Sequence, residues 1–130
     1  MYAIKKESWG YNLRFSGFIS TGEMEAWKTE SSQQLRGALQ GFGVFVDMHD
    51  LKPLAPETQE VMVSGQELFK KAGMQRSAVL VDSATTAMQF KRLAKESGID
   101  QWERYLSSQQ SGAVDAALAW IKDGVDPDAS

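Results

Sequence analysis

Apolar and polar residues alternate with a period of two near the start of the chain. Residues 2–7 and 11–19 flank a break at Ser8-Trp9-Gly10. In the second of these segments the alternating apolar positions are Leu13, Phe15 and Ile19. A period of two places alternate side chains on the same face of an extended strand. Together with the glycine-containing break, this pattern predicts a β-hairpin.

From Ser20 onward the spacing of apolar positions changes to that of a helix. Ser20 and Glu23 have the S-x-x-E spacing of a capping box. Residues 21–39 are therefore predicted to form an amphipathic helix that stops before Gly41. Its inner face is predicted to consist of Met24, Trp27, Ser31, Leu35 and Ala38.

A second helix is predicted over residues 56–72. Pro56 suits its first position, and acidic residues in the first turn with Lys70 and Lys71 in the last complement the helix dipole. Gly73 follows where a helix stop is expected. The predicted inner stripe comprises Val61, Gly65, Leu68, Phe69 and Ala72.

Two short apolar runs, Phe42–Met48 and Arg76–Asp82, predict strands that are buried on both faces. After the second run we expect a helix that ends near Ser97 before Gly98, a shorter strand over Gln101–Leu106, and a last helix over Ala113–Lys122. The inward residues of that last helix are predicted to be Val114, Ala117, Leu118 and Ile121.

This order of elements predicts one α/β domain with a mixed, mainly parallel sheet of about five strands and about four helices. The hairpin must supply at least one antiparallel strand. We expect the domain to span residues 1–123, and residues 124–130 to form a flexible tail because they have nothing to bury. In open α/β sheets, ligands bind beyond the carboxyl ends of the strands.

The amino-acid composition argues against several classes of function and of functional site. The chain has 14 Lys and Arg residues against 17 Asp and Glu residues, a net charge of −3 that argues against nucleic-acid binding as the main role. The absence of cysteine excludes disulfides, thiolate metal sites and a cysteine nucleophile. A single histidine excludes a multi-histidine metal site. We expect no metal and no cofactor.

The chain shows no targeting signal and no membrane span in its pattern. Its first seven residues carry three charges and no apolar stretch of a signal peptide. No window approaches the 18 apolar residues of a membrane helix. We therefore expect a soluble, cytoplasmic protein without integral membrane association.

Polar residues follow the predicted strands at their carboxyl ends, where a site is expected. They are carboxylates, hydroxyls and one imidazole: Ser20, Thr21, Asp47, His49, Asp50, Asp82, Ser83 and Thr85. This candidate rim would face a ligand or partner. The same residue types are also the usual helix caps and strand ends, and that plainer role is the more common one.

His49 is the one imidazole, and Asp47 lies two residues before it. In a strand the two would share a face, so a carboxylate–histidine dyad is possible, as is an enzyme that uses Asp47, His49 and Asp50. A surface histidine without a catalytic duty is the more common case. The sequence contains no G-x-S-x-G, Walker A or G-x-G-x-x-G motif, so the usual hydrolase and nucleotide sites are not expected.

Apolar content leaves a further alternative open. The chain has four Trp, three Tyr, six Phe and six Met residues. Most of the helix-borne members should fill the core, among them Met24, Trp27, Met62, Phe69, Met88 and Phe90. Six methionines would also suit an adaptable pocket for a small apolar ligand, or a partner surface.

The order of these segments resembles that of the SpoIIAA-like, STAS-related family of small bacterial proteins. The resemblance rests on Val44-Phe45-Val46-Asp47-Met48, the helix entry at Pro56-Glu57-Thr58, Ala78-Val79-Leu80-Val81-Asp82, and Ala116-Ala117-Leu118-Ala119-Trp120-Ile121. It covers residues 1–123. It implies a STAS-like sheet with helices and, for some relatives, a likeness to the CRAL-TRIO lipid-binding fold.

In anti-sigma-factor antagonists of this kind, a serine in an Asp-Ser-Ser-Gly motif at a helix start is phosphorylated to switch partner binding. The resemblance places that motif on Ala55-Pro56-Glu57-Thr58. Glu57 stands where the switched serine would be, and Thr58 is the one remaining hydroxyl. The chain therefore lacks the usual phosphorylatable serine, and Thr58 is a weak alternative acceptor.

The expected function is that of a non-enzymatic binding or regulatory module that acts through a protein partner or a homodimer. The fold and the shortage of catalytic groups support this expectation. The first alternative is a carrier of a small apolar or lipid ligand, in line with the Met and aromatic content and the CRAL-TRIO likeness. The second is the enzyme that would use Asp47, His49 and Asp50.

Overall fold

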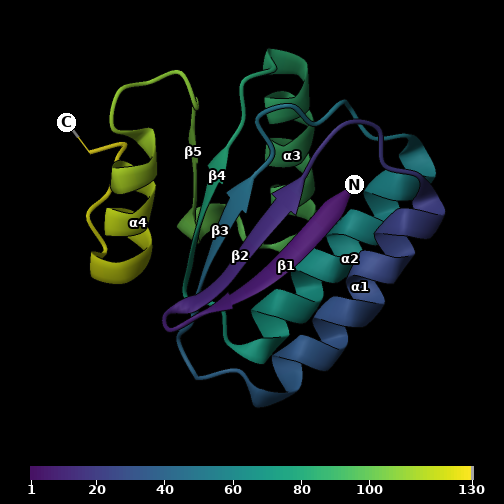
Figure 1. Cartoon of the computed structure of the whole chain (residues 1–130), viewed down its shortest axis with the longest axis horizontal. Coiled ribbons are helices and arrows are strands. Elements are labelled where there is room, and N and C mark those ends of the chain that lie inside the picture. The colour runs from purple at the N-terminus through teal and green to yellow at the C-terminus, as the bar shows by residue number, and fades with distance from the viewer. Residues whose placement is uncertain (130) are drawn as a thin grey trace.

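The alternating hairpin and the apolar runs form one five-stranded sheet in a computed structural model that describes residues 1–129 (Figure 1). The strands are β1 (Tyr2–Glu7), β2 (Gly10–Phe15), β3 (Gly43–Asp47), β4 (Arg76–Leu80) and β5 (Glu103–Leu106). The helices are α1 (Thr21–Gln34), α2 (Pro56–Ala72), α3 (Ala84–Ser97) and α4 (Ala113–Asp123), with 3-10 turns at Leu35–Gly37 and Asp100–Trp102.

The strands lie in the sheet in their order along the chain. β1 pairs with β2 in the antiparallel sense, and every later pair is parallel. The register runs straight across the sheet, since Tyr11 lies opposite Val44, Val44 opposite Ser77, and Ser77 opposite Glu103. The predicted single α/β domain with a mixed, mostly parallel sheet of five strands and four helices is therefore confirmed.

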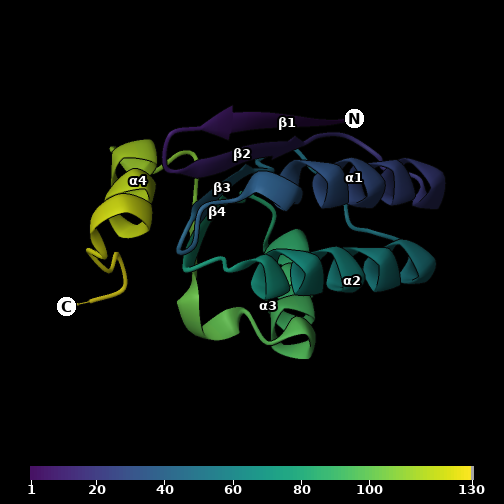
Figure 2. The same ribbon diagram turned by 90° about the horizontal axis from the view of Figure 1, so that it is seen from below.

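Each parallel connection moves one strand farther in the same direction. Because parallel crossovers are right-handed, three such steps place their helices on the same face of the sheet. Figure 2 shows α1, α2 and α3 together on one side of the strands and α4 on the other. The sheet therefore has no topological switch point, which is the feature that opens a ligand crevice in doubly wound folds.

The three-helix face holds the larger part of the core. Trp27 of α1 is 2% exposed and lies across α2, where its ring stacks on Phe69 with a centroid distance of 5.9 Å. Phe15 meets the same indole edge-on at 5.3 Å. Gly65 makes this approach possible, because a Cβ there would lie 2.2 Å from Cζ3 of Trp27. The expected inner positions of α1 and α2 are thus confirmed where they meet.

The opposite face is closed by α4 over β3, β4 and β5. The buried residues of this second cluster are Phe45, Ala78, Leu80, Leu106, Ala113, Ala117, Trp120 and Ile121. The expectation for α4 was partly wrong, because Val114 is 48% exposed and Trp120 faces inward instead. Nε1 of Trp120 donates to the carbonyls of Ser77 at 3.0 Å and Trp102 at 3.1 Å, which orients the ring toward the sheet.

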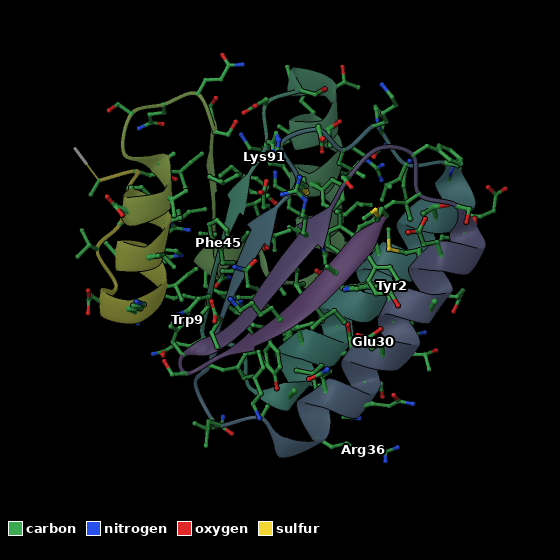
Figure 3. All side chains as sticks on the ribbon, in the orientation of Figure 1. Tyr2, Trp9, Glu30, Arg36, Phe45 and Lys91 are labelled. Carbon is green, nitrogen blue, oxygen red and sulfur yellow. The ribbon has the colours of Figure 1, made fainter. Side chains whose placement is uncertain are left out.

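On the side of the sheet that carries α4, the face of β1 and β2 is polar. Ala3, Lys5 and Arg14 point to this face and are exposed. On the other face of β1, the Tyr2 hydroxyl donates to Glu30 of α1 at 2.9 Å (Figure 3). The hairpin is therefore apolar only where helices cover it.

Several predicted boundaries were wrong by a few residues. β2 ends at Phe15, before Ile19, and α1 ends at Gln34, with the 3-10 turn Leu35–Gly37 in place of its last predicted turn. Met88, expected in the core, is 73% exposed on α3.

After α4 the chain forms no further helix or strand within the described residues. Asp126 nevertheless accepts two hydrogen bonds from Arg104, at 2.8 and 3.1 Å. Among residues 1–129, no helix has both the length and the apolarity that crossing a membrane requires.

Candidate functional site

The carboxyl edge of the sheet consists of the ends of β2 to β5 and the loops that follow them. Three of the predicted rim residues meet there: Asp47 at the end of β3, His49 after it, and Asp82 after β4. Nδ1 of His49 lies 2.7 Å from Oδ1 of Asp47, and the His49 backbone N–H donates to the same oxygen at 3.2 Å. Asp47 and His49 therefore form the carboxylate–histidine pair that the sequence left open as an alternative.

The dyad favours the protonated form of His49 by raising its pKa. The hydrogen bond to Asp47 raises the pKa of His49, and the negative charges of Asp47 and Asp50 add to that effect against a smaller opposing effect of burial. Arg14 of β2 lies 3.5 Å from the other oxygen of Asp47. The His49 side chain is 37% exposed, so the imidazole remains open to solvent.

Asp82 anchors the loop that follows β5. Its carboxylate accepts hydrogen bonds from the Ser108 backbone N–H at 2.7 Å, from the Ser108 hydroxyl at 2.5 Å and from the Ser107 hydroxyl at 3.2 Å. These bonds lower the pKa of Asp82, and the charge of nearby His49 lowers it further. The sequence carries no signal for these serines, because no pattern shows which loop lies beside β4.

The other rim residues serve as helix caps or lie apart from the dyad. Ser20 Oγ accepts from the Glu23 N–H at 3.1 Å, and Ser83 Oγ accepts from the Thr86 N–H at 3.2 Å, as helix N-caps do. Thr85 is exposed on the first turn of α3. Within residues 1–129, no hydrogen bond joins Ser20, Ser83 or Thr85 to the dyad.

Thr21 belongs to a different contact. Its hydroxyl lies 2.8 Å from that of Thr58, and the pair joins the first turns of α1 and α2. Thr58 is 1% exposed, so a kinase cannot reach its hydroxyl in the folded protein. Glu57, which occupies the place of the switched serine in the resemblance, is exposed.

At the carboxyl edge His49 can bind a proton, and the charged side chains around it can contact charged groups of a partner. No group of three or more His, Asp and Glu residues in the part of the chain that the structure describes is placed to hold a metal ion. Among those same residues, His49 has no hydroxyl within hydrogen-bond distance, so the dyad has no bonded nucleophile to activate.

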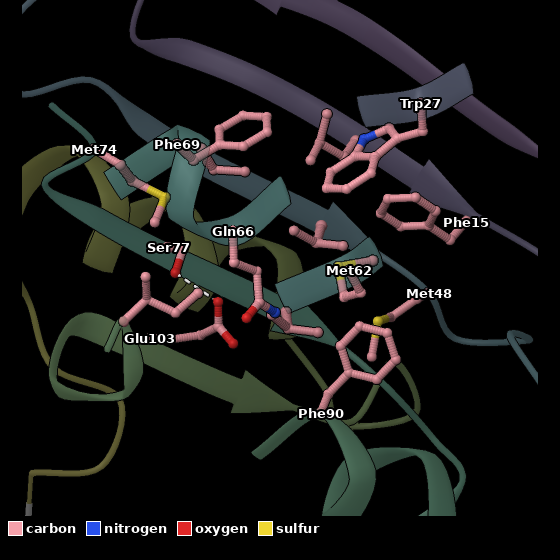
Figure 4. A pocket seen from close by; sticks show the side chains of 15 residues that line it. Phe15, Trp27, Met48, Met62, Gln66, Phe69, Met74, Ser77, Phe90 and Glu103 are labelled. Atoms are coloured by element: carbon pink, nitrogen blue, oxygen red, sulfur yellow. Dashed lines mark hydrogen bonds between the residues drawn. The ribbon is translucent and has the colours of Figure 1, made fainter. Parts of the chain in front are cut away.

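A small cavity lies inside the three-helix core (Figure 4). Its volume is about 40 Å³, which holds one or two water molecules and is far below the roughly 300–1,000 Å³ of small-molecule pockets. Its polar wall includes Glu103 of β5, which accepts a hydrogen bond from the Ser77 hydroxyl at 2.9 Å and another from Tyr105. Gln66 of α2 lines the cavity and accepts from Ser97 at 2.7 Å.

Glu103 is a buried carboxyl without a cationic partner among the described residues. Burial raises its pKa to about 7, although the two hydroxyl donors favour the charged form, and the charge of Asp100 raises it further. The sequence carried no signal for this residue, because a glutamate in an edge strand has the pattern of a solvent-facing position.

A larger hollow lies at the opposite, amino edge of the sheet, where no site was predicted. This groove has a volume of about 570 Å³ and lies between the hairpin turn, the segment before β3 and the end of α4. Its walls come from four segments distant in sequence, so no local motif marks it. Comparison of the sequence with models of known protein families and with curated proteins gives no match.

Replacement of Glu103 by glutamine should change how stability depends on pH. A carboxyl whose folded pKa is raised stabilises the fold while it is protonated, and this contribution is lost as pH rises from 4.5 to about 7. The full loss corresponds to about 3 kcal/mol. Urea unfolding at pH 4.5 and pH 8 should show such a decrease in the free energy of unfolding, and Glu103→Gln should remove most of it.

Both proteins in that comparison should carry His49→Gln, because the raised pKa of His49 contributes in the same direction. Asp82 and Asp126 have lowered pKa values, so their contributions are lost only at more acidic pH. If the free energy of unfolding depends on pH equally with and without Glu103→Gln, Glu103 does not bind a proton in the folded interior.

The contact between Asp47 and His49 predicts how substitutions change the pKa of His49. Asp47→Asn should lower the pKa of His49, because the hydrogen bond to a charged carboxylate is the largest cause of its rise. Asp50→Asn should lower it less, since Asp50 acts only through its charge. NMR titration of the imidazole carbon-bound protons measures both midpoints. An unchanged midpoint in Asp47→Asn would show that the dyad does not form in solution.

Proposed function

We propose that this protein is a non-enzymatic binding module of STAS-like fold that engages another protein, or a second copy of itself, through the carboxyl edge of its sheet. The resemblance in the order of segments supports the fold assignment. The shortage of catalytic groups around the dyad supports a binding role. A phosphorylatable serine is absent at the helix start, and Glu57 keeps a negative charge there.

The distribution of exposed apolar side chains carries this proposal. Among residues 1–129, six large hydrophobic side chains are strongly exposed. Four of them lie at the carboxyl edge, and two lie at the amino edge. The four are Met1, Phe18, Met88 and Val114. Aromatic residues and methionines are typical anchors of protein interfaces, so this edge has the composition of a binding surface.

Phe18 is the strongest of these anchors because its backbone is held in place. The side chain is 67% exposed, whereas that of its neighbour Ile19 is 2% exposed in the core. The Gly17 N–H donates to Asp50 at 3.3 Å, and the Lys52 N–H donates to Gly17 at 3.0 Å. An apolar side chain on an ordered backbone loses little conformational entropy on binding.

The loop of residues 50–54, which hydrogen-bonds Gly17 next to Phe18, also hydrogen-bonds the start of α3. The Thr86 hydroxyl donates to the Leu51 carbonyl at 3.2 Å, and the Gln89 side chain bonds both the N–H and the carbonyl of Leu54. Met88 is 73% exposed on this same helical turn. Phe18 and Met88 are therefore presented by one rigid unit, with the charged dyad on the neighbouring strand end.

Site-specific photo-crosslinking tests the proposal in the cell from which the protein comes. Benzoylphenylalanine in place of Phe18 keeps an aromatic side chain and should give one discrete adduct on illumination. The same group in place of Leu39, which is 74% exposed at the amino edge, is the matched control and should give none. An adduct of about twice 14.4 kDa would identify a second copy, and another mass would identify a different protein.

A second substitution tests whether the adduct reports a specific surface. Met88→Glu should reduce the yield from position 18 several-fold, whereas Val125→Glu, at the amino edge, should leave it unchanged. The proposal is wrong if position 18 gives no adduct, or if positions 18 and 39 give the same set.

A further inference from the structure

Glycines border the groove at the amino edge. Gly10, at the start of β2, has a φ of +152°, and a Cβ there would lie 1.8 Å from the carbonyl oxygen of Gly43. At Gly37 an added Cβ would meet nothing within 4 Å. The volume of about 570 Å³ falls within the range of small-molecule sites.

Two residues that line the groove offer apolar surface. Trp9 forms the tip of the hairpin, at the end of the sheet that meets α4 (Figure 3). Its ring packs on the second core cluster and is half-buried, which fixes its position. Leu39 lines the groove from the segment before β3 and is 74% exposed. Together they offer an aromatic and an aliphatic surface to an apolar ligand body.

The other lining residues make the groove positive. Lys6, Arg76 and Lys122 contribute three cations, and Glu7 contributes one carboxylate, a net charge of +2. The whole chain has a net charge of −3, so the net charge of the groove is opposite in sign to that of the chain as a whole. Among residues 1–129, none of the three cations forms an ion pair with a carboxylate.

Arg76 is held in place without an acidic partner in the described part of the chain. Its Nε and Nη2 donate to the Ile121 carbonyl, at 3.4 and 3.3 Å, near the end of α4. The negative end of that helix dipole is equivalent to about half an elementary charge. The net side-chain charge of the groove, +2, is larger than this half charge.

We propose that the amino-edge groove binds a small organic anion, one acidic group on an apolar body of one or two rings or a branched chain. The acidic group lies among Lys6, Arg76 and Lys122, and the apolar body lies between Trp9 and Leu39. This site is separate from the proposed protein-binding edge and lies at the other end of the strands.

A matched pair of probes tests this assignment. 8-Anilinonaphthalene-1-sulfonate has an aromatic body with one acidic group, and N-phenyl-1-naphthylamine has the same body without it. Titration of the full chain, followed by probe fluorescence and by two-dimensional NMR, should show one sulfonate bound per chain. The NMR shifts should centre on the Trp9 indole and the neighbouring backbone, and the neutral probe should bind at least tenfold more weakly.

Charge variants identify the cations. Lys6→Gln combined with Lys122→Gln should weaken sulfonate binding about tenfold and reduce its dependence on salt concentration. The control is Lys52→Gln combined with Lys95→Gln, which removes the same charge from exposed positions outside the groove and should leave the affinity within twofold. Unchanged NMR spectra away from the groove show that each variant is folded.

Four results would overturn the proposal: no sulfonate binding at millimolar concentration, equal binding of the neutral probe, shifts centred elsewhere, or equal losses in both double variants. Leu39→Ser provides a separate readout because it changes no charge. It should weaken the binding of both probes by a similar factor and leave the salt dependence of sulfonate binding unchanged.

Discussion

The winding of the sheet is the constraint on which the rest of the structure depends. Three right-handed connections step in one direction, so α1, α2 and α3 crowd one face and leave the other to a single helix. That face is apolar only over β3, β4 and β5, where Phe45, Ala78 and Leu80 need a cover. α4 covers these residues, whereas the outer face of β1 and β2 is polar and needs no covering helix.

The same winding gives the two edges of the sheet different characters. Helices α1 to α3 begin at the carboxyl edge, where capping serines, the Asp47–His49 dyad and the exposed Phe18 and Met88 gather. Those helices, and α4 as well, end at the amino edge, where the hairpin turn and the end of α4 enclose a groove with net positive charge. We propose the first edge as a protein-binding surface and the second as a site for a small organic anion.

Much of this could be predicted from the sequence, for a physical reason. The strands and helices follow from apolar periodicity, and the meeting of Asp47, His49 and Asp82 follows from the position of parallel strand ends. What could not be predicted depends on packing between distant segments. Trp120 turns inward, where two backbone carbonyls accept its Nε1–H. Glu103 is buried against a cavity that Gln66 of α2 and Phe90 of α3 also line, and the groove lies between four segments distant in sequence.

Native-state hydrogen exchange tests the central claim most directly. The claim is that, among residues 1–129, α4 is the one helix that closes the second face of the sheet. If detachment of α4 exposes Phe45, Ala78 and Leu80 together, the amides of α4 should exchange with the same opening free energy and the same denaturant dependence as those of β3 and β4. Exchange of α4 amides through a smaller, separate opening, with β3 and β4 still fully protected, would contradict the account.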